Sequence, residues 1–268
     1  MNLQEVMLKM IKLNEVTVKH KSGKTLLHDI SFQLEKGRCV GLTGESGAGK
    51  TTILKAMMGL LGTGACITSG NIKIDDKDIG KLNEKEKRLL RGKTLGFIPQ
   101  NPMTAFDDRI TIGKQMLETL KIHGITKNAK ELVLTCLEQV GLRDAKRVFE
   151  SCSGQLSGGM LQRVSVAVIL ALNPTYIIAD EPTAALDEEN KNLLMTLLQQ
   201  RLVNSAILLV THDPDVLKMM CDEVVVIENG PITEHTTELF DNPQTQWSQS
   251  FVQASRLGKE QKFTWKES

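Results

Sequence analysis

Apolar and polar residues alternate in two stretches near the start of the chain. The stretches are residues 11–18 and 26–32, and Lys21-Ser22-Gly23 between them is typical of a turn. Because alternation with a period of two predicts strands with one buried face, we expect an antiparallel hairpin here. Residues 70–75 have a similar pattern and are expected to add a strand to this small sheet.

Apolar residues recur at helical spacing in the middle of the chain, from about Thr111 to Leu142. Gly124 and Gly141 interrupt the pattern and predict the ends of helices. We therefore expect an α-helical subdomain of about residues 102–165, inserted into a larger α/β core.

Short apolar runs alternate with helical patterns in the last third of the chain, which is typical of the α/β class. The predicted order is a helix to Leu172, a strand at 176–179, a helix at 188–202, a strand at 206–210, a helix to about Met220 and a strand at 224–227 that ends at the Asn229-Gly230 turn. We expect residues 1–242 to form one domain and residues 243–268 to form a polar C-terminal tail.

The charges of the chain nearly balance, with 33 basic and 32 acidic residues and a net charge of +1. This balance gives no electrostatic indication of a nucleic-acid partner. No run approaches the ~18 consecutive apolar residues of a membrane span, and the N-terminal residues lack the basic patch and apolar block of a signal peptide. Any membrane association is therefore expected to go through a partner.

Five cysteines are scattered along the chain without a C-x-x-C pair: Cys39, Cys66, Cys136, Cys152 and Cys221. Several of them lie within apolar stretches. This favours buried thiols in a reducing cytosol over disulfides or a metal site.

Residues 44–51 match the pattern G-x-x-x-x-G-K-[ST]. The apolar run at 39–42 predicts a buried strand before this loop, and residues 52–58 predict a helix after it. Glycines allow such a loop to turn its backbone N–H groups toward a phosphate, and the helix N-terminus adds partial positive charge. An ordinary glycine-rich turn is the alternative, but the four fixed positions and their flanks favour nucleotide binding.

The predicted nucleotide-binding residues of this loop are Gly44, Glu45, Ser46, Gly47, Ala48, Gly49, Lys50, Thr51 and Thr52. We expect Lys50 to reach the β- and γ-phosphates and the hydroxyl of Thr51 to ligate Mg²⁺.

Two carboxylates, Asp180 and Glu181, follow the predicted strand at 176–179. At the carboxyl end of a strand, Asp180 can hold Mg²⁺ through water and Glu181 can point at an attacking water. A solvated strand end is the alternative.

His212 follows the next strand, where a lone histidine is more often a cap or a surface residue. Two phosphate-site motifs at the same predicted sheet edge favour a catalytic role for it.

Leu156-Ser157-Gly158-Gly159-Met160 is a further candidate site. Ser157 can cap a helix that starts near Met160, and the two glycines leave the first amides uncovered for an anion. The alternative is an ordinary capped helix start.

Together, these motifs resemble the ATP-binding subunits of ABC transporters over nearly the whole chain. The resemblance implies an α/β fold: a P-loop NTPase (RecA-like) core with an N-terminal antiparallel β subdomain and an inserted α-helical subdomain. The matching motifs are residues 44–51 for Walker A, Gln100 for the Q-loop, Leu156–Met160 for the signature, Ile177–Asp180 for Walker B, Ala185-Leu186-Asp187 for the D-loop and His212 for the switch histidine.

The family assigns a role to each of these positions. Glu181 would be the catalytic base, with His212 and Gln100 as further catalytic residues. ATP and Mg²⁺ would be the cofactors, and Thr51, Gln100 and Asp180 would ligate the metal. Ser157, Gly158 and Gly159 would contact the γ-phosphate of an ATP bound to a second subunit, in a head-to-tail dimer. The segment expected to stack on adenine has His20 or Lys21 where the family usually has a Tyr or Phe, and His20 is the expected nucleotide contact.

Residues 101–107 and 160–163 are similar to those of peptide and nickel importers, and closest to nickel-type subunits. This resemblance implies an ATPase that powers uptake of nickel, other metal chelates or short peptides. Its expected partners are two membrane permeases, a second ATP-binding subunit (a paralogue or a second copy) and, indirectly, an extracytoplasmic substrate-binding protein. The expected location is peripheral, at the cytoplasmic face of the cell membrane.

Two other classes of protein carry a P-loop. A soluble ABC ATPase acting on nucleic acid or ribosomes would usually have long coiled-coil insertions or two ATP sites in tandem, which this sequence lacks. A P-loop kinase or GTPase would have no use for the signature motif, and the guanine-specific N-K-x-D is absent. The transport ATPase is therefore favoured, with no nucleic-acid partner.

Overall fold

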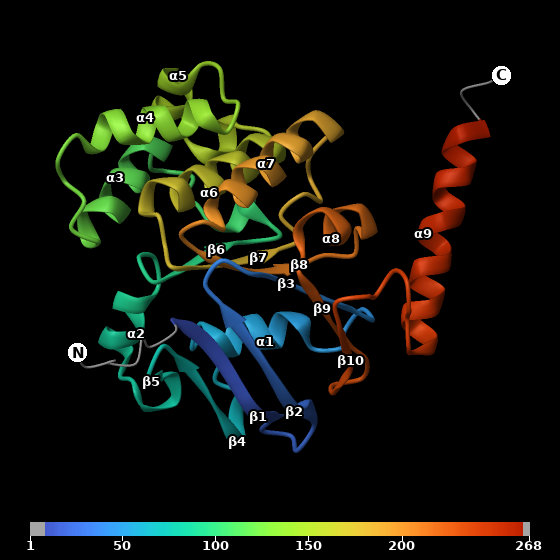
Figure 1. The fold of residues 1–268 in the computed structure, drawn as a ribbon. Helices are drawn as coiled ribbons and strands as arrows, with labels where there is room; N and C mark the ends of the chain where they lie inside the picture. The colour runs from blue at the N-terminus through green and yellow to red at the C-terminus, as the bar shows by residue number, and fades with distance from the viewer. Residues whose placement is uncertain (1–8, 265–268) are drawn as a thin grey trace, which may run out of the picture. The chain divides into compact units, whose positions relative to one another are not determined.

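The computed structural model describes residues 9–264 of the chain, without the side chains of 257–264. The backbone drawn in Figure 1 has the elements named below. It divides into two compact units. The first unit consists mainly of residues 81–208, and the second mainly of residues 11–34, 39–80 and 209–264.

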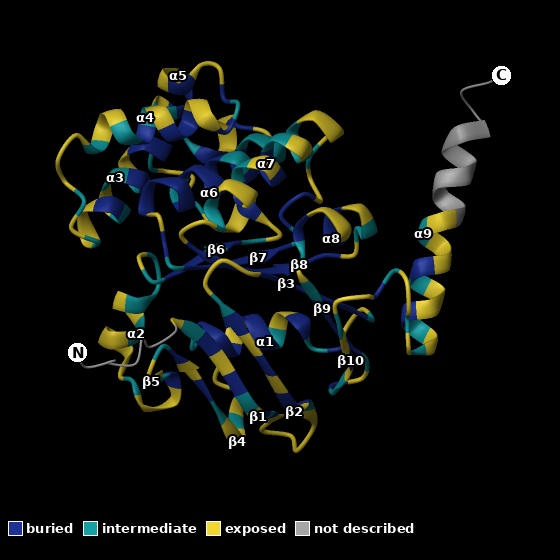
Figure 2. Ribbon diagram, in the orientation of Figure 1, coloured by how far each residue is buried: buried dark blue, intermediate teal, exposed yellow. Residues whose placement is uncertain are grey.

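The second unit contains a four-stranded antiparallel sheet near the start of the chain. Its strands are β1 (Met10–His20), β2 (Thr25–Glu35), β4 (Ala65–Ile74) and β5 (Lys77–Asp78), in the order β2-β1-β4-β5. Buried and exposed residues alternate along β1 and β2, as the banding in Figure 2 shows. The predicted hairpin and its added strand are therefore confirmed.

Three further strands of the second unit lie around the glycine-rich loop. They are β3 (Cys39–Gly44), β9 (Glu223–Ile227) and β10 (Ile232–Thr236). Strand β3 pairs in parallel with β9, and β9 pairs antiparallel with β10. Asn229 and Gly230 have φ values of 52° and 113°, so they form the predicted tight turn between β9 and β10. Helices α1 (Lys50–Met57) and α8 (Pro214–Met220) pack against β3.

The first unit contains the strands β6 (Leu95–Ile98) and β7 (Tyr176–Asp180), which pair in parallel. Strand β8 (Ala206–Val210) neighbours β7, and its first three residues belong to this unit. All five residues of β7 are buried, as expected for a strand covered on both faces. The α/β class predicted for this region is confirmed.

The helices of the first unit are α2 (Glu84–Leu90), α3 (Ile112–Ile122), α4 (Ala129–Gln139), α5 (Ala145–Glu150), α6 (Gly158–Leu172) and α7 (Glu188–Arg201). Short 3₁₀ turns occur at Ile79–Lys81, Pro102–Thr104 and Ser153–Gln155. Helices α3, α4 and α5 pack against one another, and α3 and α4 also pack against α6. Gly124 and Gly141, both at φ 77°, follow α3 and α4 as the interrupted pattern predicts.

A helix, α9 (Gln246–Thr264), occupies most of the polar C-terminal tail. Its Trp247 and Phe251 rings stack with centroids 5.0 Å apart, and Val252 is 3% exposed. These side chains belong to an apolar cluster of the second unit that includes Leu217, Val224, Val226, Leu239 and Phe240. No element was predicted here because the tail is polar and its apolar residues are weakly patterned.

None of the five cysteines forms a disulfide, but only Cys39 and Cys136 are buried, and Cys66 is exposed. The described residues contain no group of three or more His, Cys, Asp or Glu side chains that could hold a metal ion. Among the same residues, no helix is long and apolar enough to cross a membrane.

We expect α9 to stabilise the second unit. Phe251→Ala should lower the free energy of unfolding by about 1–3 kcal/mol, because it removes a half-buried ring that stacks on Trp247. Chemical denaturation of the full chain measures this change, with Gln253→Ala, an exposed position on the same helix, as the control. Equal stability of the two variants would show that the aromatic contact contributes nothing.

Candidate nucleotide site

The loop at residues 44–49 leaves β3 through a turn that only glycine can form at two positions. At Gly44, with φ 133°, an added Cβ would lie 2.0 Å from the carbonyl oxygen of Ile227. At Gly49, with φ 113°, it would lie 2.5 Å from a methyl group of Leu27. The loop backbone is therefore packed against β9 at Gly44 and against the start of β2 at Gly49, with no room for a side chain at these two positions.

The ammonium group of Lys50 is held by this loop. Its Nζ donates hydrogen bonds to the carbonyl oxygens of Gly44, at 2.7 Å, and Glu45, at 2.8 Å. The side chain is only 8% exposed. The loop thus fixes one positive charge beside its own backbone, as phosphate binding requires.

The N-terminus of α1 has the features of an anion site. Its N-cap residue, Gly49, supplies no side-chain hydrogen bond, and its first turn contains no acidic residue. The first N–H groups of a helix have no partners within the helix and carry partial positive charge. Thr51 and Thr52 lie in this first turn, where the sequence analysis placed nucleotide contacts.

His212 lies between β8 and α8, and its imidazole lies within electrostatic range of Lys50. The pKa of His212 is lowered, first by partial desolvation and second by the positive charge of Lys50. The following residue, Asp213, caps α8 by accepting hydrogen bonds from the N–H groups of Asp215 and Val216. The structure therefore brings the P-loop lysine close enough to the predicted switch histidine for its charge to disfavour the imidazolium.

His20 lies at the end of β1, with an exposed side chain. Its Nδ1 is 2.8 Å from the hydroxyl of Ser22, and its ring packs against Gly64, where a Cβ would lie 2.7 Å from Nε2. The ring is exposed enough to stack on a base, so its predicted role in adenine binding stays a prediction.

The two predicted carboxylates lie in the first unit, at the end of β7. Asp180 is buried, at 7% exposure, as the last residue of the strand. Glu181 has a φ of 45°, in the left-handed region that non-glycine residues rarely adopt. Backbone strain of this kind is concentrated at functional sites, because the surrounding fold must hold it in place.

The signature segment lies at the start of α6, also in the first unit. Ser157 is the N-cap and accepts a hydrogen bond from the N–H of Met160 at 3.2 Å, as predicted, although the helix begins at Gly158. Ser157 is exposed, and a Cβ at Gly158 would meet no atom within 4 Å. The first turn of α6 contains no acidic residue. These features together fit an anion-binding helix start.

Gln162 and Arg163 are candidate functional residues that the sequence analysis used only as subfamily markers. The buried Gln162 amide donates a hydrogen bond to the carbonyl of Pro99 at 3.2 Å and so ties α6 to the residue before the exposed Gln100. The available signal was a group of polar residues, Gln162, Arg163 and Ser165, in a mostly apolar helix, because buried polar groups need partners.

Comparisons with known proteins agree with this geometry. The model of the ABC transporter family matches residues 27–184. The metal-staphylopine import system ATP-binding protein CntD of Staphylococcus aureus strain Mu50 is 37% identical over 232 residues, which cover 83% of this chain and 85% of that protein. The oligopeptide transport ATP-binding protein OppD of Lactococcus lactis strain SK11 is 36% identical over 236 residues, covering 85% and 70% of the two chains.

Solved structures show the same fold. The dimeric, post-hydrolysis structure of the ATP-binding cassette MJ0796, bound to ADP and Pi, matches with a TM-score of 0.76 and 26% identity. The match covers 84% of this chain and 97% of that cassette. The chain therefore belongs to the ABC transporter family, as an ATP-binding subunit that hydrolyses ATP. The predicted P-loop NTPase fold is thereby confirmed.

We expect the pKa of His212 to depend on Lys50. Lys50→Gln removes the positive charge that disfavours the imidazolium, so the pKa of His212 should rise toward its ordinary value. At any pH between the pKa of His212 in the wild type and its pKa in the variant, a larger fraction of the imidazole is then protonated in the variant. NMR titration of the His212 ring measures this change, with Lys55→Gln, an exposed position on α1, as the control. An unchanged pKa in Lys50→Gln would contradict the proximity of the two groups.

Proposed function

We propose that this subunit powers the import of metal chelates or short peptides, with nickel-type substrates favoured, through permeases in the membrane. Relatives named for metal-staphylopine, oligopeptide and dipeptide transport support this proposal. The observation that carries it is a pocket in the first unit, lined by the segment that resembles nickel and peptide importers.

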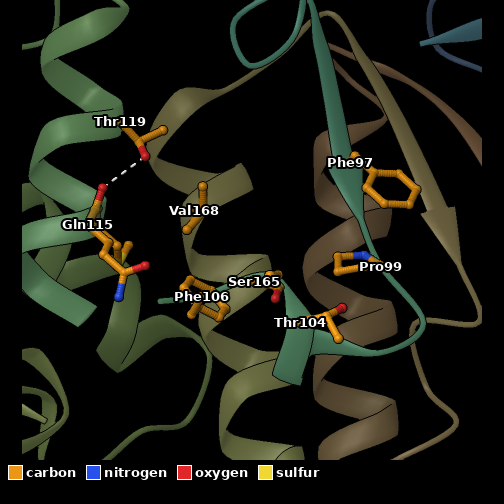
Figure 3. Close-up of a pocket in the computed structure, with 10 residues that line it drawn as sticks. Phe97, Pro99, Thr104, Phe106, Gln115, Thr119, Ser165 and Val168 are labelled. Atoms are coloured by element: carbon orange, nitrogen blue, oxygen red, sulfur yellow. Dashed lines mark hydrogen bonds between the residues drawn. The ribbon is translucent and has the colours of Figure 1, made fainter. Parts of the chain in front are cut away.

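The pocket has a volume of about 410 Å³ and is mostly apolar (Figure 3). Its lining comes from the end of β6, the segment after Gln100, and helices α3 and α6: Phe97, Pro99, Thr104, Ala105, Phe106, Gln115, Met116, Thr119, Ser165 and Val168. Met103, beside this lining, is 50% exposed. A concave apolar surface of this kind fits the apolar face of a short helix from a partner protein.

Gln115 holds the loop that follows the pocket lining. Its Oε1 accepts a hydrogen bond from the N–H of Asp107, and its Nε2 donates to the carbonyls of Asp107 and Ile110 at 2.9 and 2.7 Å. Asp107 also binds Arg109, which lowers the pKa of this carboxyl to about 2. The loop is therefore held in place before any partner binds, and this lowers the entropic cost of docking.

We propose the following roles in hydrolysis. Lys50 and the N–H groups of residues 44–52 bind the phosphates, and His20 contacts the adenine. Glu181 acts as the base toward the attacking water, while His212 and Gln100 orient that water and the γ-phosphate. A neutral His212, as its lowered pKa favours, can accept a hydrogen bond from water.

The proposed metal is Mg²⁺, which would neutralise charge on the phosphates. Thr51, Gln100 and Asp180 supply hydroxyl, amide and carboxylate oxygens, which are the ligand types that Mg²⁺ prefers, directly or through water. The donor set of these residues therefore fits the metal.

We propose that Ser157, Gly158 and Gly159 complete the ATP site of a second ATP-binding subunit, either a paralogue or a second copy. The exposed Ser157 and the open space around Gly158 support this role, since a ligand on another molecule can reach them. Two permeases and, indirectly, an extracytoplasmic binding protein complete the proposed transporter. The subunit itself would be peripheral at the cytoplasmic face of the membrane.

Transport can be tested with the assembled transporter in vesicles that contain ATP. Labelled Ni²⁺, a nickel chelate and a short peptide are offered separately, and at least one should accumulate. Glu181→Gln should bind ATP normally but hydrolyse it at least ~10²-fold more slowly, because the base is lost, and accumulation should stop. Glu188→Gln, an exposed carboxylate in the first turn of α7, is the control. ATP-dependent export, or no transport of any of the three, would contradict the proposal.

The role of the signature segment can be tested with Gly158→Asp. This variant should still bind ATP but should lose hydrolysis, because it sets a carboxylate against the γ-phosphate of the opposite subunit. If the partner is a second copy, mixing it with Lys50→Ala should restore partial activity, since one of the two sites is then intact. If the partner is a paralogue, the mixture stays inactive. Wild-type turnover by Gly158→Asp in the assembled transporter would refute the role.

A further inference from the structure

The D-loop segment Ala185-Leu186-Asp187 lies directly against the first turn of α6. A Cβ at Gly159 would lie 3.2 Å from the carbonyl oxygen of Ala185 and 3.6 Å from a methyl group of Leu186. Glycine is therefore favoured at position 159 for a second reason, besides leaving its own N–H uncovered. It lets the backbone of the D-loop approach the signature segment.

Arg163, one turn further along α6, links three parts of the first unit. Its Nη1 donates a hydrogen bond to the carbonyl of Gly141 at 3.0 Å, in the turn that ends α4. Its Nε donates a longer bond, at 3.4 Å, to the carbonyl of Gly159 in the signature segment. Gly141 is also close to α7, because a Cβ there would lie 2.9 Å from a methyl group of Leu193. The guanidinium therefore lies where α4, α6 and α7 meet.

The exposed carboxylate of Asp187 lies within electrostatic range of the Arg163 guanidinium. Desolvation lowers the pKa of Arg163, and the carboxylate of Asp187 opposes that shift. The pKa of Asp187 is lowered, first by hydrogen bonds from Asn190 and to a smaller extent by the charge of Arg163. The two groups thus stabilise each other's charged forms.

Asp187 also fixes the start of α7. It is the N-cap of this helix and accepts a hydrogen bond from the N–H of Asn190 at 2.9 Å. The side-chain amide of Asn190 donates to both of its carboxylate oxygens, at 2.8 and 2.9 Å. Whatever holds Asp187 therefore holds both the end of the D-loop and the beginning of α7.

We propose that Arg163 is a positioning residue that fixes the D-loop against the signature segment, so that both meet the opposing subunit as one rigid surface. The proposal rests on the proposed role of Ser157, Gly158 and Gly159 at the ATP site of that subunit. An arginine suits the task because its planar fork can direct separate donors at two carbonyls, those of Gly159 and Gly141. A lysine keeps the charge but has no such fork.

Hydrogen exchange on the full-length chain tests the local part of this proposal. Arg163→Met should increase the exchange of amides in residues 157–160 and 184–190, while residues 44–52 keep their wild-type rates. Arg163→Lys should restore part of the protection. Arg147→Met, which removes an exposed arginine of α5, is the matched control and should change neither segment. Wild-type exchange at 184–190 in Arg163→Met would overturn the proposal.

ATP hydrolysis by the assembled transporter separates positioning from a general loss of folding. Arg163→Met should lower kcat about tenfold or more, since small misplacements are costly in catalysis, while the KM for ATP stays within about twofold of wild type. Asp187→Asn keeps the helix cap but removes the charge, and it should also lower kcat. Because both variants break one interaction, the double variant should be no slower than the slower single one. Additive losses would overturn the link through Asp187.

The same assays distinguish this proposal from the proposed function. If Gly158→Asp abolishes hydrolysis but Arg163→Met and Arg163→Lys both turn over like wild type, the positioning role is wrong and the signature role stands. If Gly158→Asp turns over like wild type, the signature role fails, and the positioning role fails with it. In a third outcome, kcat falls only where thermal stability falls by a matching amount, in Arg163→Lys and Asp187→Asn as well as in Arg163→Met. Arg163 would then only stabilise the fold, and the positioning role would be wrong.

Discussion

The nucleotide site depends on the close approach of two backbone segments where β3 ends. Gly44 lies so near the carbonyl of Ile227 that no side chain fits between them, and the parallel pairing of β3 with β9 holds them there. The chain can then turn at once and begin α1 at Lys50. The carbonyls of Gly44 and Glu45 hold the ammonium of Lys50 in turn. The position of the Lys50 ammonium group thus follows from strand pairing.

Helix α6 has a comparable place in the first unit, because two adjacent residues connect it to different neighbours. Gln162 binds the carbonyl of Pro99, next to the pocket lining and to Gln100. Arg163 binds the Gly141 turn and lies within electrostatic range of Asp187. Buried polar contacts of this kind specify one arrangement of the elements more strictly than apolar packing does. The signature segment at the start of α6 therefore cannot shift without disturbing both the pocket and the D-loop.

Most of the fold follows from the sequence because its signals are local. Alternation gave β1 and β2, the glycine breaks gave the ends of α3 and α4, and Asn229-Gly230 gave the final turn. The loop at 44–51 was predictable because its backbone geometry requires glycine at fixed positions, and this produces a recognisable sequence pattern. Three features could not be predicted from the sequence: the left-handed φ of Glu181, the aromatic cluster of α9 and the contact of Arg163 with Gly141. Each depends on tertiary neighbours far along the chain, which a local pattern does not encode.

The left-handed backbone of Glu181 also limits which mutations are tolerated at this position. Of the residues that one nucleotide change can reach from a glutamate codon, Gly and Asp adopt positive φ most readily, whereas Val, being β-branched, does so at a high cost. An aspartate would keep the charge and the backbone and would only shorten the side chain. A genetic screen at this codon therefore reports on backbone conformation as well as on chemistry.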